Sequence, residues 1–160
     1  MSPAFEIRPA VSADDLAEVA RLFNAYAASL EIDLGYQDFT GELAGLPGKY
    51  AAPAGALLLA RDGADEAIGC VGLRSLGDGV CEMKRLFVAP EGRGLGLGRA
   101  LMNAVAEEAR RLGYREMRLD TLPTMAAAQS LYRQAGFEPV PPYYDTPVDG
   151  TVFMRLALAN

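Results

Sequence analysis

The stretch Arg93-Gly94-Leu95-Gly96-Leu97-Gly98 decides how the rest of the chain is interpreted, because the spacing of apolar residues changes there. Before it, Val80 to Val88 forms the third of three strand-like runs. After it, apolar residues return at helical spacing, and Gly113 marks the end of the predicted helix. The apolar stripe of this helix consists of Leu97, Leu101, Val105, Ala109 and Leu112. The stretch is therefore predicted to join a strand to the start of a helix.

Glycines alternate through this junction, at positions 92, 94, 96 and 98. Glycine admits backbone conformations closed to other residues and lets a ligand approach the chain closely. The first N–H groups of a helix have no partner within the helix, and together with the positive end of the helix dipole they favour phosphate. Arg93 can add a charged donor. The junction is therefore predicted to be a pyrophosphate-binding loop.

Other interpretations of a glycine-rich loop fit less well. A Walker loop requires Gly-Lys-Ser/Thr, and no lysine lies here. A dinucleotide fingerprint requires G-x-G-x-x-G, whereas the spacing here is G-x-G-x-G and the preceding strands look antiparallel. A turn that binds nothing stays open, although each glycine in a helix interior costs about 1 kcal/mol.

Length, composition and net charge limit the classes of protein to which the chain could belong. The chain has 160 residues, of which 51% are hydrophobic, and this suits one domain spanning residues 1–160. A net charge of −6 and the lack of a basic run argue against a nucleic-acid partner. No apolar run approaches the roughly 20 residues that span a bilayer, and the first residues do not resemble a signal peptide. We therefore expect a cytoplasmic protein without a membrane segment.

The chain contains no histidine, which excludes Ser-His-Asp and Cys-His catalysis, a histidine base and histidine-ligated metals. Two cysteines are too few for a zinc site. In simple hairpin register around the turn at Gly77, Cys81 faces Ser75 and not Cys70, so a disulfide is not expected. We expect no metal and two buried thiols.

The remaining elements follow from local patterns. Strands are predicted over 5–9, 56–61, 67–76, 80–88, 117–121 and 151–158, with a further short strand near Val140. Helices are predicted over 12–29, 97–112 and 126–135, with Ser12 and Thr124 as N-caps and Gly136 as a stop. Within the segment 33–46, Phe39, Leu43 and Leu46 suggest a second short helix that Pro47-Gly48 ends. Asp-Gly turns make the middle of the chain an antiparallel meander. This order predicts one α/β domain.

Two segments resemble the GNAT superfamily of N-acetyltransferases. Val88-Ala89-Pro90 followed by Arg93 to Leu101 is similar to the family signature Gln/Arg-x-x-Gly-x-Gly/Ala, which Arg93, Gly96 and Gly98 meet. Leu131-Tyr132-Arg133-Gln134-Ala135-Gly136-Phe137 is similar to the later helix of the family, with its Leu-Tyr and Gly-Phe pairs. The order of elements matches along nearly the whole chain.

The resemblance implies an α/β (α+β) fold: a mixed central sheet of six to seven strands, about four flanking helices, and a cleft where two central strands splay apart. It implies acetyl-CoA as co-substrate and direct attack of an acceptor's primary amine on the thioester in a ternary complex. The alternative is a non-catalytic module that binds acyl-CoA as a sensor or regulator. Members of the family often form dimers, so the resemblance also implies a homodimer.

The resemblance also implies roles for particular residues. Tyr132 matches the tyrosine that can protonate the departing thiolate. Glu82 stands at the offset of the catalytic glutamate in the histone acetyltransferase branch and is the predicted base, with a water chain as the alternative. On a regular strand, Glu82 would share a face with Lys84, Leu86 and Val88. The predicted cofactor contacts are Leu86, Phe87, Val88, Arg93, Gly94, Leu95, Gly96, Leu97, Gly98, Arg99, Thr121, Gln129 and Tyr132.

One position departs from the family. Met125 stands where relatives often have an asparagine that contacts pantetheine, and Thr121 or Gln129 could supply this contact instead.

The resemblance also implies where the acceptor binds. In the family, the acceptor pocket is built from the first two helices and the last hairpin, to which residues 33–50 and 141–149 correspond here. Acidic and aromatic groups in these segments could receive a cationic amine through charge and cation–π contact, and a plain polar surface is equally open. The candidates are Asp33, Tyr36, Tyr50, Tyr143 and Tyr144, with Gln37 and Asp145 beside them. Nothing in these segments distinguishes a small-molecule acceptor from a peptide.

Overall fold

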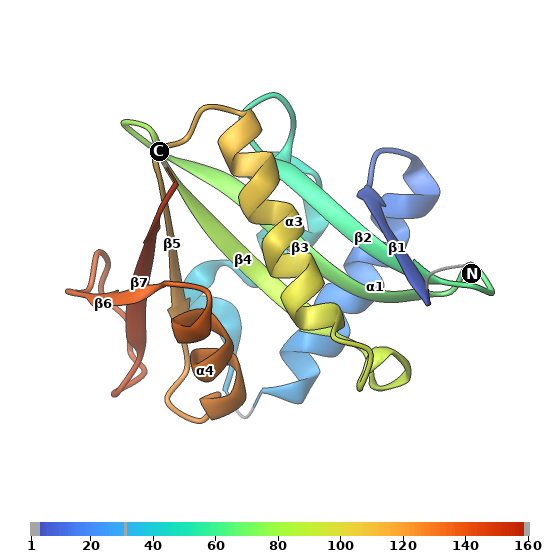
Figure 1. Ribbon diagram of the computed structural model, residues 1–160. Coiled ribbons are helices and arrows are strands. Elements are labelled where there is room, and N and C mark those ends of the chain that lie inside the picture. The colour runs from blue at the N-terminus through green and yellow to red at the C-terminus, as the bar shows by residue number, and fades with distance from the viewer. Residues whose placement is uncertain (1–3, 31, 159–160) are drawn as a thin grey trace.

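The computed structural model describes residues 4–30 and 32–158 and has one sheet with helices on both faces (Figure 1). The strands are β1 (Phe5–Pro9), β2 (Ala56–Asp62), β3 (Ala67–Gly77), β4 (Val80–Val88), β5 (Glu116–Thr121), β6 (Glu138–Val140) and β7 (Val152–Ala157). The α-helices are α1 (Ala13–Ser29), α2 (Phe39–Ala44), α3 (Leu97–Arg111) and α4 (Ala126–Gln134). Short 3-10 helices are η1 (Leu34–Gln37), η2 (Gly48–Tyr50) and η3 (Pro90–Gly92).

The sheet has the order β1-β2-β3-β4-β5-β7-β6. Neighbouring strands run antiparallel except β4 and β5, which are parallel. The mixed seven-stranded sheet with four α-helices confirms the predicted fold class.

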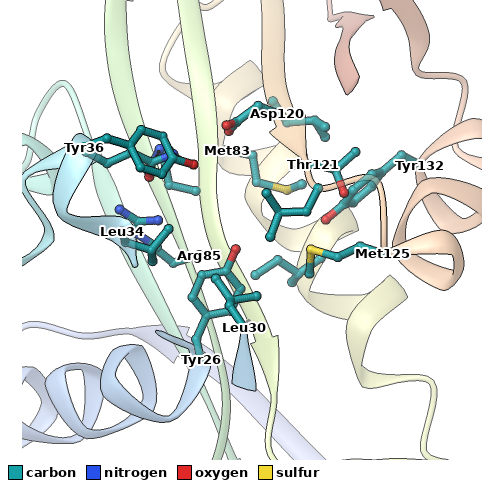
Figure 2. A pocket seen from close by; sticks show the side chains of 15 residues that line it. Tyr26, Leu30, Leu34, Tyr36, Met83, Arg85, Asp120, Thr121, Met125 and Tyr132 are labelled. Carbon is teal, nitrogen blue, oxygen red and sulfur yellow. Dashed lines mark hydrogen bonds between the residues drawn. The ribbon is translucent and has the colours of Figure 1, made fainter. Parts of the chain in front are cut away.

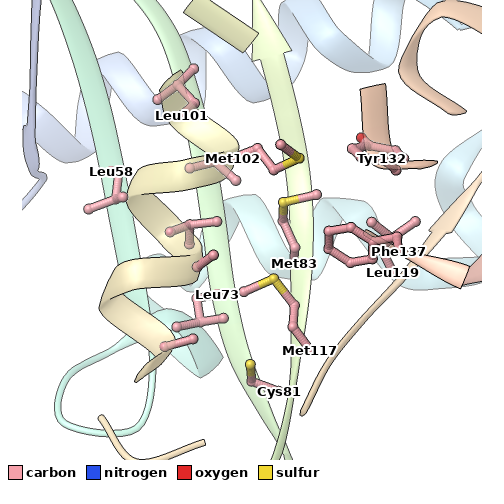
Figure 3. Packing of buried hydrophobic residues seen from close by; sticks show 14 of the residues in the cluster. Leu58, Leu73, Cys81, Met83, Leu101, Met102, Met117, Leu119, Tyr132 and Phe137 are labelled. Carbon is pink, nitrogen blue, oxygen red and sulfur yellow. The ribbon is translucent and has the colours of Figure 1, made fainter. Parts of the chain in front are cut away.

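Helices divide the core into two layers. Helix α3 lies across one face of the sheet and α1 across the other (Figure 1). Helix α1 begins at a capping box in which Ser12 and Asp15 satisfy each other's backbone N–H groups, as the sequence predicted. Its buried residues Val19, Leu22 and Phe23 pack on the sheet. On the other face, leucines of α3 pack with three methionines from β4, α3 and β5 (Figure 3).

Strands β4 and β5 pair over only three residues before they diverge. The pairs run from Val80–Glu116 to Glu82–Arg118, and beyond them the strands splay apart (Figure 1). Helix α4, which follows β5, lies beside the opening. The polar backbone edges of the two strands are thereby turned toward a common cleft rather than toward each other.

A β-bulge lies at the start of this divergence. Lys84 pairs with Gly72 and Phe87 with Cys70, so two residues of β4 face only Val71 on β3. Arg85 takes the left-handed conformation, with φ of 59°. A bulge of this kind reverses the alternation of side chains along the strand.

The bulge corrects one prediction. Glu82 does not share a face with Leu86 and Val88, because the extra residue at Arg85 shifts the later part of the strand to the opposite face. Leu86 and Val88 instead pack on the α3 side with Cys81 and Met83, whereas Phe87 packs on the α1 side.

Most of the other local predictions are confirmed, and the predicted cap of α4 is wrong. The meander β2-β3-β4 and the strand near Val140 are present. Both thiols are free and buried, and Cys81 pairs with Ser75 as predicted. The short helix predicted within the segment 33–46 is α2, and the 3-10 helix η1 precedes it. Thr124 is not the cap of α4, because Met125 occupies that position and makes no side-chain cap.

Gly72 on β3 offers a test of the packing behind the cleft. A Cβ there would lie 2.8 Å from Cε1 of Tyr50, whose ring packs edge-on against Phe23. We expect Gly72→Ala to lower the free energy of unfolding by about 1–3 kcal/mol through overpacking. Gly63→Ala is the control, because a Cβ there meets nothing within 4 Å. Urea unfolding of both variants measures the effect, and equal stability of the two would contradict it.

Candidate active site

The cleft between β4 and β5 is lined by side chains from both strands, from α1 and η1, and from α4 (Figure 2). Tyr26 and Tyr36 approach from the α1–η1 side, and Met125 and Tyr132 from the opposite side. The divergence of the strands thus produces an elongated pocket with two different walls. Its lining residues include Leu30, Leu34, Gln37, Met83, Lys84, Arg85, Leu86, Leu119, Asp120, Thr121 and Leu122.

Two hydroxyl groups lie together inside the cleft. Tyr132 is 7% exposed, and its hydroxyl points toward Thr121 (Figure 2). Burial raises the pKa of Tyr132, so its hydroxyl keeps its proton at neutral pH. The hydroxyl of Thr121 is buried and has no hydrogen-bond partner among the described residues. Because such an atom is costly in a folded protein, it is suited to a hydrogen bond with a ligand in the cleft.

The glycine loop follows β4, one wall of the cleft, and leads through η3 into α3; its residues are not among those that line the pocket. Gly94 and Gly96 have φ of 82° and 73°, conformations that favour glycine. Gly96 is the N-cap of α3, where no side chain satisfies the first N–H groups. Such a helix start suits an anion, and the binding of pyrophosphate here stays a prediction. Arg93 is exposed beside them.

Several predicted cofactor residues have structural partners. The amide of Gln129 donates to the carbonyl of Leu122 at 2.9 Å, which fixes the turn before α4. Arg99 donates to Oε1 of Gln134 at 2.7 Å and so joins α3 to α4. The side chain of Leu97 is buried in the core, which leaves its N–H for a ligand. Phe87 packs edge-on with Tyr26 on the α1 side, so only its backbone is suited to the cofactor.

Glu82 lies behind the cleft rather than in its lining. Its carboxylate is fully buried and accepts hydrogen bonds from Nε of Arg74 at 2.7 Å and from the hydroxyl of Tyr143 at 2.6 Å. Burial and the hydrogen bond to Glu82 raise the pKa of Tyr143. Glu82 thus holds the segment between β6 and β7 against the sheet.

A second buried ion pair fixes the bulge. Arg85 is 5% exposed and donates from Nε and Nη2 to the two carboxylate oxygens of Glu42 on α2, at 3.1 and 3.0 Å. Although burial alone lowers its pKa, the Glu42 carboxylate raises the pKa of Arg85 above its ordinary value. The guanidinium also lies 5.2 Å from the ring centroid of Phe39. Glu42 further accepts from the hydroxyl of Tyr50 at 3.0 Å.

Lys84 and Asp120 line the cleft, although neither is among the site residues that the sequence predicts. Lys84 is 7% exposed, and its Nζ donates to Oε1 of Gln37 at 3.1 Å. Asp120 accepts a hydrogen bond from the hydroxyl of Tyr144. The only sequence signal was that each is a charged residue within a strand-like run.

The predicted acceptor residues separate into two groups. Tyr36 lines the cleft, while Tyr143 and Tyr144 hold the carboxylates of Glu82 and Asp120 and pack around Phe153. Tyr50 and Asp33 lie elsewhere: Tyr50 is 3% exposed in the core, and Asp33 is an exposed cap that accepts from the N–H of Gly35. The structure therefore does not bring these two to the cleft.

Comparison with known proteins identifies the fold. The profile of the acetyltransferase (GNAT) family matches residues 17–137. An uncharacterised N-acetyltransferase of Schizosaccharomyces pombe is 42% identical over 147 residues, which cover 91% of this chain and 90% of the relative. A GNAT-family acetyltransferase of Staphylococcus aureus superposes with a TM-score of 0.82 at 21% identity, covering 98% of this chain and 100% of the other.

A second structure, an acetyltransferase of Salmonella typhimurium described with its cofactor acetyl-CoA, has a TM-score of 0.68 at 24% identity and covers 98% of this chain and 95% of that one. Fold, cleft and relatives define the class of the protein as an acyltransferase. The chain belongs to the GNAT family of N-acetyltransferases. Among residues 4–30 and 32–158, no helix is long and apolar enough to cross a membrane, and no acidic or thiol cluster could hold a metal ion.

The pair of Glu42 and Arg85 gives a stability prediction. We expect Glu42→Gln to lower the free energy of unfolding by about 3 kcal/mol, because it leaves the buried guanidinium without a counter-charge. Glu107→Gln is the matched control, since Glu107 pairs with Arg110 on the exposed side of α3 and should change nothing measurable. Chemical denaturation compares the two, and equal effects would contradict a special role for the buried pair.

Proposed function

We propose that the protein transfers the acetyl group of acetyl-CoA to a primary amine by direct attack in a ternary complex. The observation that carries this proposal is the cleft between β4 and β5, which holds a buried pair of hydroxyls. Its wall β4 leads through the glycine loop to the start of α3, which suits an anion. Membership of the GNAT family and the acetyl-CoA of the Salmonella neighbour support the choice of donor.

The donor fits the residues of the cleft. The N–H groups of residues 94–99, with Arg93, hold the pyrophosphate at the start of α3. The edge of β4 beyond the bulge, from Leu86 to Val88, pairs with the pantetheine arm. The unsatisfied hydroxyl of Thr121 supplies a hydrogen bond in the place of the asparagine that Met125 replaces. When bound, acetyl-CoA supplies the activated acyl group.

Tyr132 is the proposed acid. It lines the cleft, is nine-tenths buried, and keeps its proton at neutral pH because burial raises its pKa. As the amine attacks the thioester carbonyl and the C–S bond breaks, the tyrosine proton passes to the CoA thiolate.

The proton of the amine requires a base within direct reach or one water away. Sequence predicts Glu82 for this role, but both oxygens of Glu82 already accept hydrogen bonds and Glu82 does not line the cleft. Asp120 lines the cleft and uses one oxygen for Tyr144. We favour Asp120 as the base, with Glu82 fixing Tyr143 behind it.

A homodimer and a cytoplasmic location stay predictions from the sequence. No nucleic acid is needed in the proposed reaction.

Release of free CoA from acetyl-CoA in the presence of a panel of primary amines tests the proposed reaction. We expect Tyr132→Phe to lower kcat by about 100-fold or more, the usual contribution of a general acid, with little change in the KM for acetyl-CoA. Tyr114→Phe is the control, because the Tyr114 hydroxyl bonds only to the carbonyl of Ala54, away from the cleft. An unchanged kcat in Tyr132→Phe would refute the acid role.

The pH dependence of kcat/KM distinguishes the two carboxylates. Removing the base should abolish the fall of kcat/KM on its acid side. We expect this in Asp120→Asn, whereas Glu82→Gln should keep the shape of the profile. The opposite result would return the role to Glu82, and a profile unaltered in both variants would assign the proton to a water chain.

A further inference from the structure

Most charges behind the acceptor end of the cleft are arranged in pairs. Arg74 pairs with Glu82 at 2.7 Å, and Arg85 pairs with Glu42 at 3.0 Å. These pairs neutralise each other within the protein. Among the charged residues that line the cleft, Lys84 and Asp120 are left.

Lys84 carries a buried ammonium with a neutral partner. Its Nζ donates to the amide oxygen of Gln37, and within the described ranges no carboxylate lies within 4.0 Å of it. An ammonium has three donors, so two are available. Burial lowers the pKa of Lys84 while Glu82 and Asp120 oppose this shift, so an added anion at Nζ would favour the charged form.

Asp120 presents the opposite charge from β5. One of its oxygens accepts from Tyr144, and that hydroxyl also lies 3.3 Å from Nε2 of Gln37, the residue that holds Lys84. Lys84 on β4 and Asp120 on β5 are therefore connected through one hydrogen-bonded chain that runs by way of Gln37 and Tyr144. They do not form an ion pair with each other.

We propose that the acceptor is a small amino acid that binds with its carboxylate at Lys84 and its amine at Asp120. This rests on the proposed function and names the acceptor class of that same site. A carboxylate fits better than a phosphate, because one ammonium matches one negative charge, whereas phosphate sites usually combine several charged donors. Both charges of a zwitterion would be paired in a cleft that otherwise leaves a buried ammonium and a partly buried carboxylate apart.

The test compares matched acceptors that differ only in the carboxylate: L-amino acids, their amides and the corresponding decarboxylated amines, each with acetyl-CoA. We expect kcat/KM to favour the amino acids by about 10-fold or more, the usual scale of a charge-assisted hydrogen bond. Lys84→Met keeps most of the length of the side chain and removes the charge. It should bring the ratio of amino acid to amide close to one by raising the KM for the amino acid, with the KM for acetyl-CoA unchanged.

Lys49→Met is the matched control, because Lys49 is exposed and outside the cleft, and it should keep the wild-type preference. Equal use of amides and amino acids, or a preference that survives in Lys84→Met, overturns the inference and leaves the acetyltransferase activity standing. Acetylation of Lys84 itself, seen as a mass gain on that residue with acetyl-CoA alone, also overturns it. Failure of every acceptor to release CoA, with acetyl-CoA still raising the Tm, counts instead against the proposed function.

Discussion

The buried contact between Arg85 and Glu42 is the interaction on which the cleft depends. Strand β4 must pair with β3 along its length, yet it pairs with β5 over only three residues. The bulge at Arg85 lies where the two strands part, in a left-handed conformation that a non-glycine residue adopts only when its surroundings demand it. Both carboxylate oxygens of Glu42 accept hydrogen bonds from the guanidinium, and the rings of Phe39 and Tyr26 lie near it. The bulge is thus joined to α2, beside the wall of the cleft that α1 and η1 form.

The glycine loop at the start of α3, which is the proposed pyrophosphate site, is built differently. It uses the backbone of a local turn, two glycines in left-handed conformations and the start of α3. Because these features lie close together in the sequence, local patterns predict the turn and the helix start well, while the binding of pyrophosphate there stays a prediction. The two periodicities of the chain also predict the order of strands and helices, since each strand and helix must bury one apolar face.

The acceptor end could not be predicted in the same way. A period of two along β4 places Glu82 with Leu86, and no glycine or proline at Arg85 announces the extra residue that separates them. Tyr50 is as aromatic as Tyr36, but only the tertiary structure shows that the first is in the core and the second in the cleft. Lys84 and Asp120 come together across strands that are far apart in sequence, so local spacing carries no sign of their relation.

The charged residues in and behind the cleft form two groups: those that already have an oppositely charged partner in the protein, and those that do not. Arg74 with Glu82 and Arg85 with Glu42 are closed pairs whose hydrogen bonds fix geometry, and a group held this way is poorly placed to accept a further proton. Among the residues that the structure describes, the hydrogen-bond partners of Lys84 and Asp120 are neutral: Gln37 and Tyr144. In a low-dielectric cleft such charges interact strongly with an incoming ligand. The pairs therefore hold the walls, and the two remaining charges are those suited to recognise an acceptor and receive its proton.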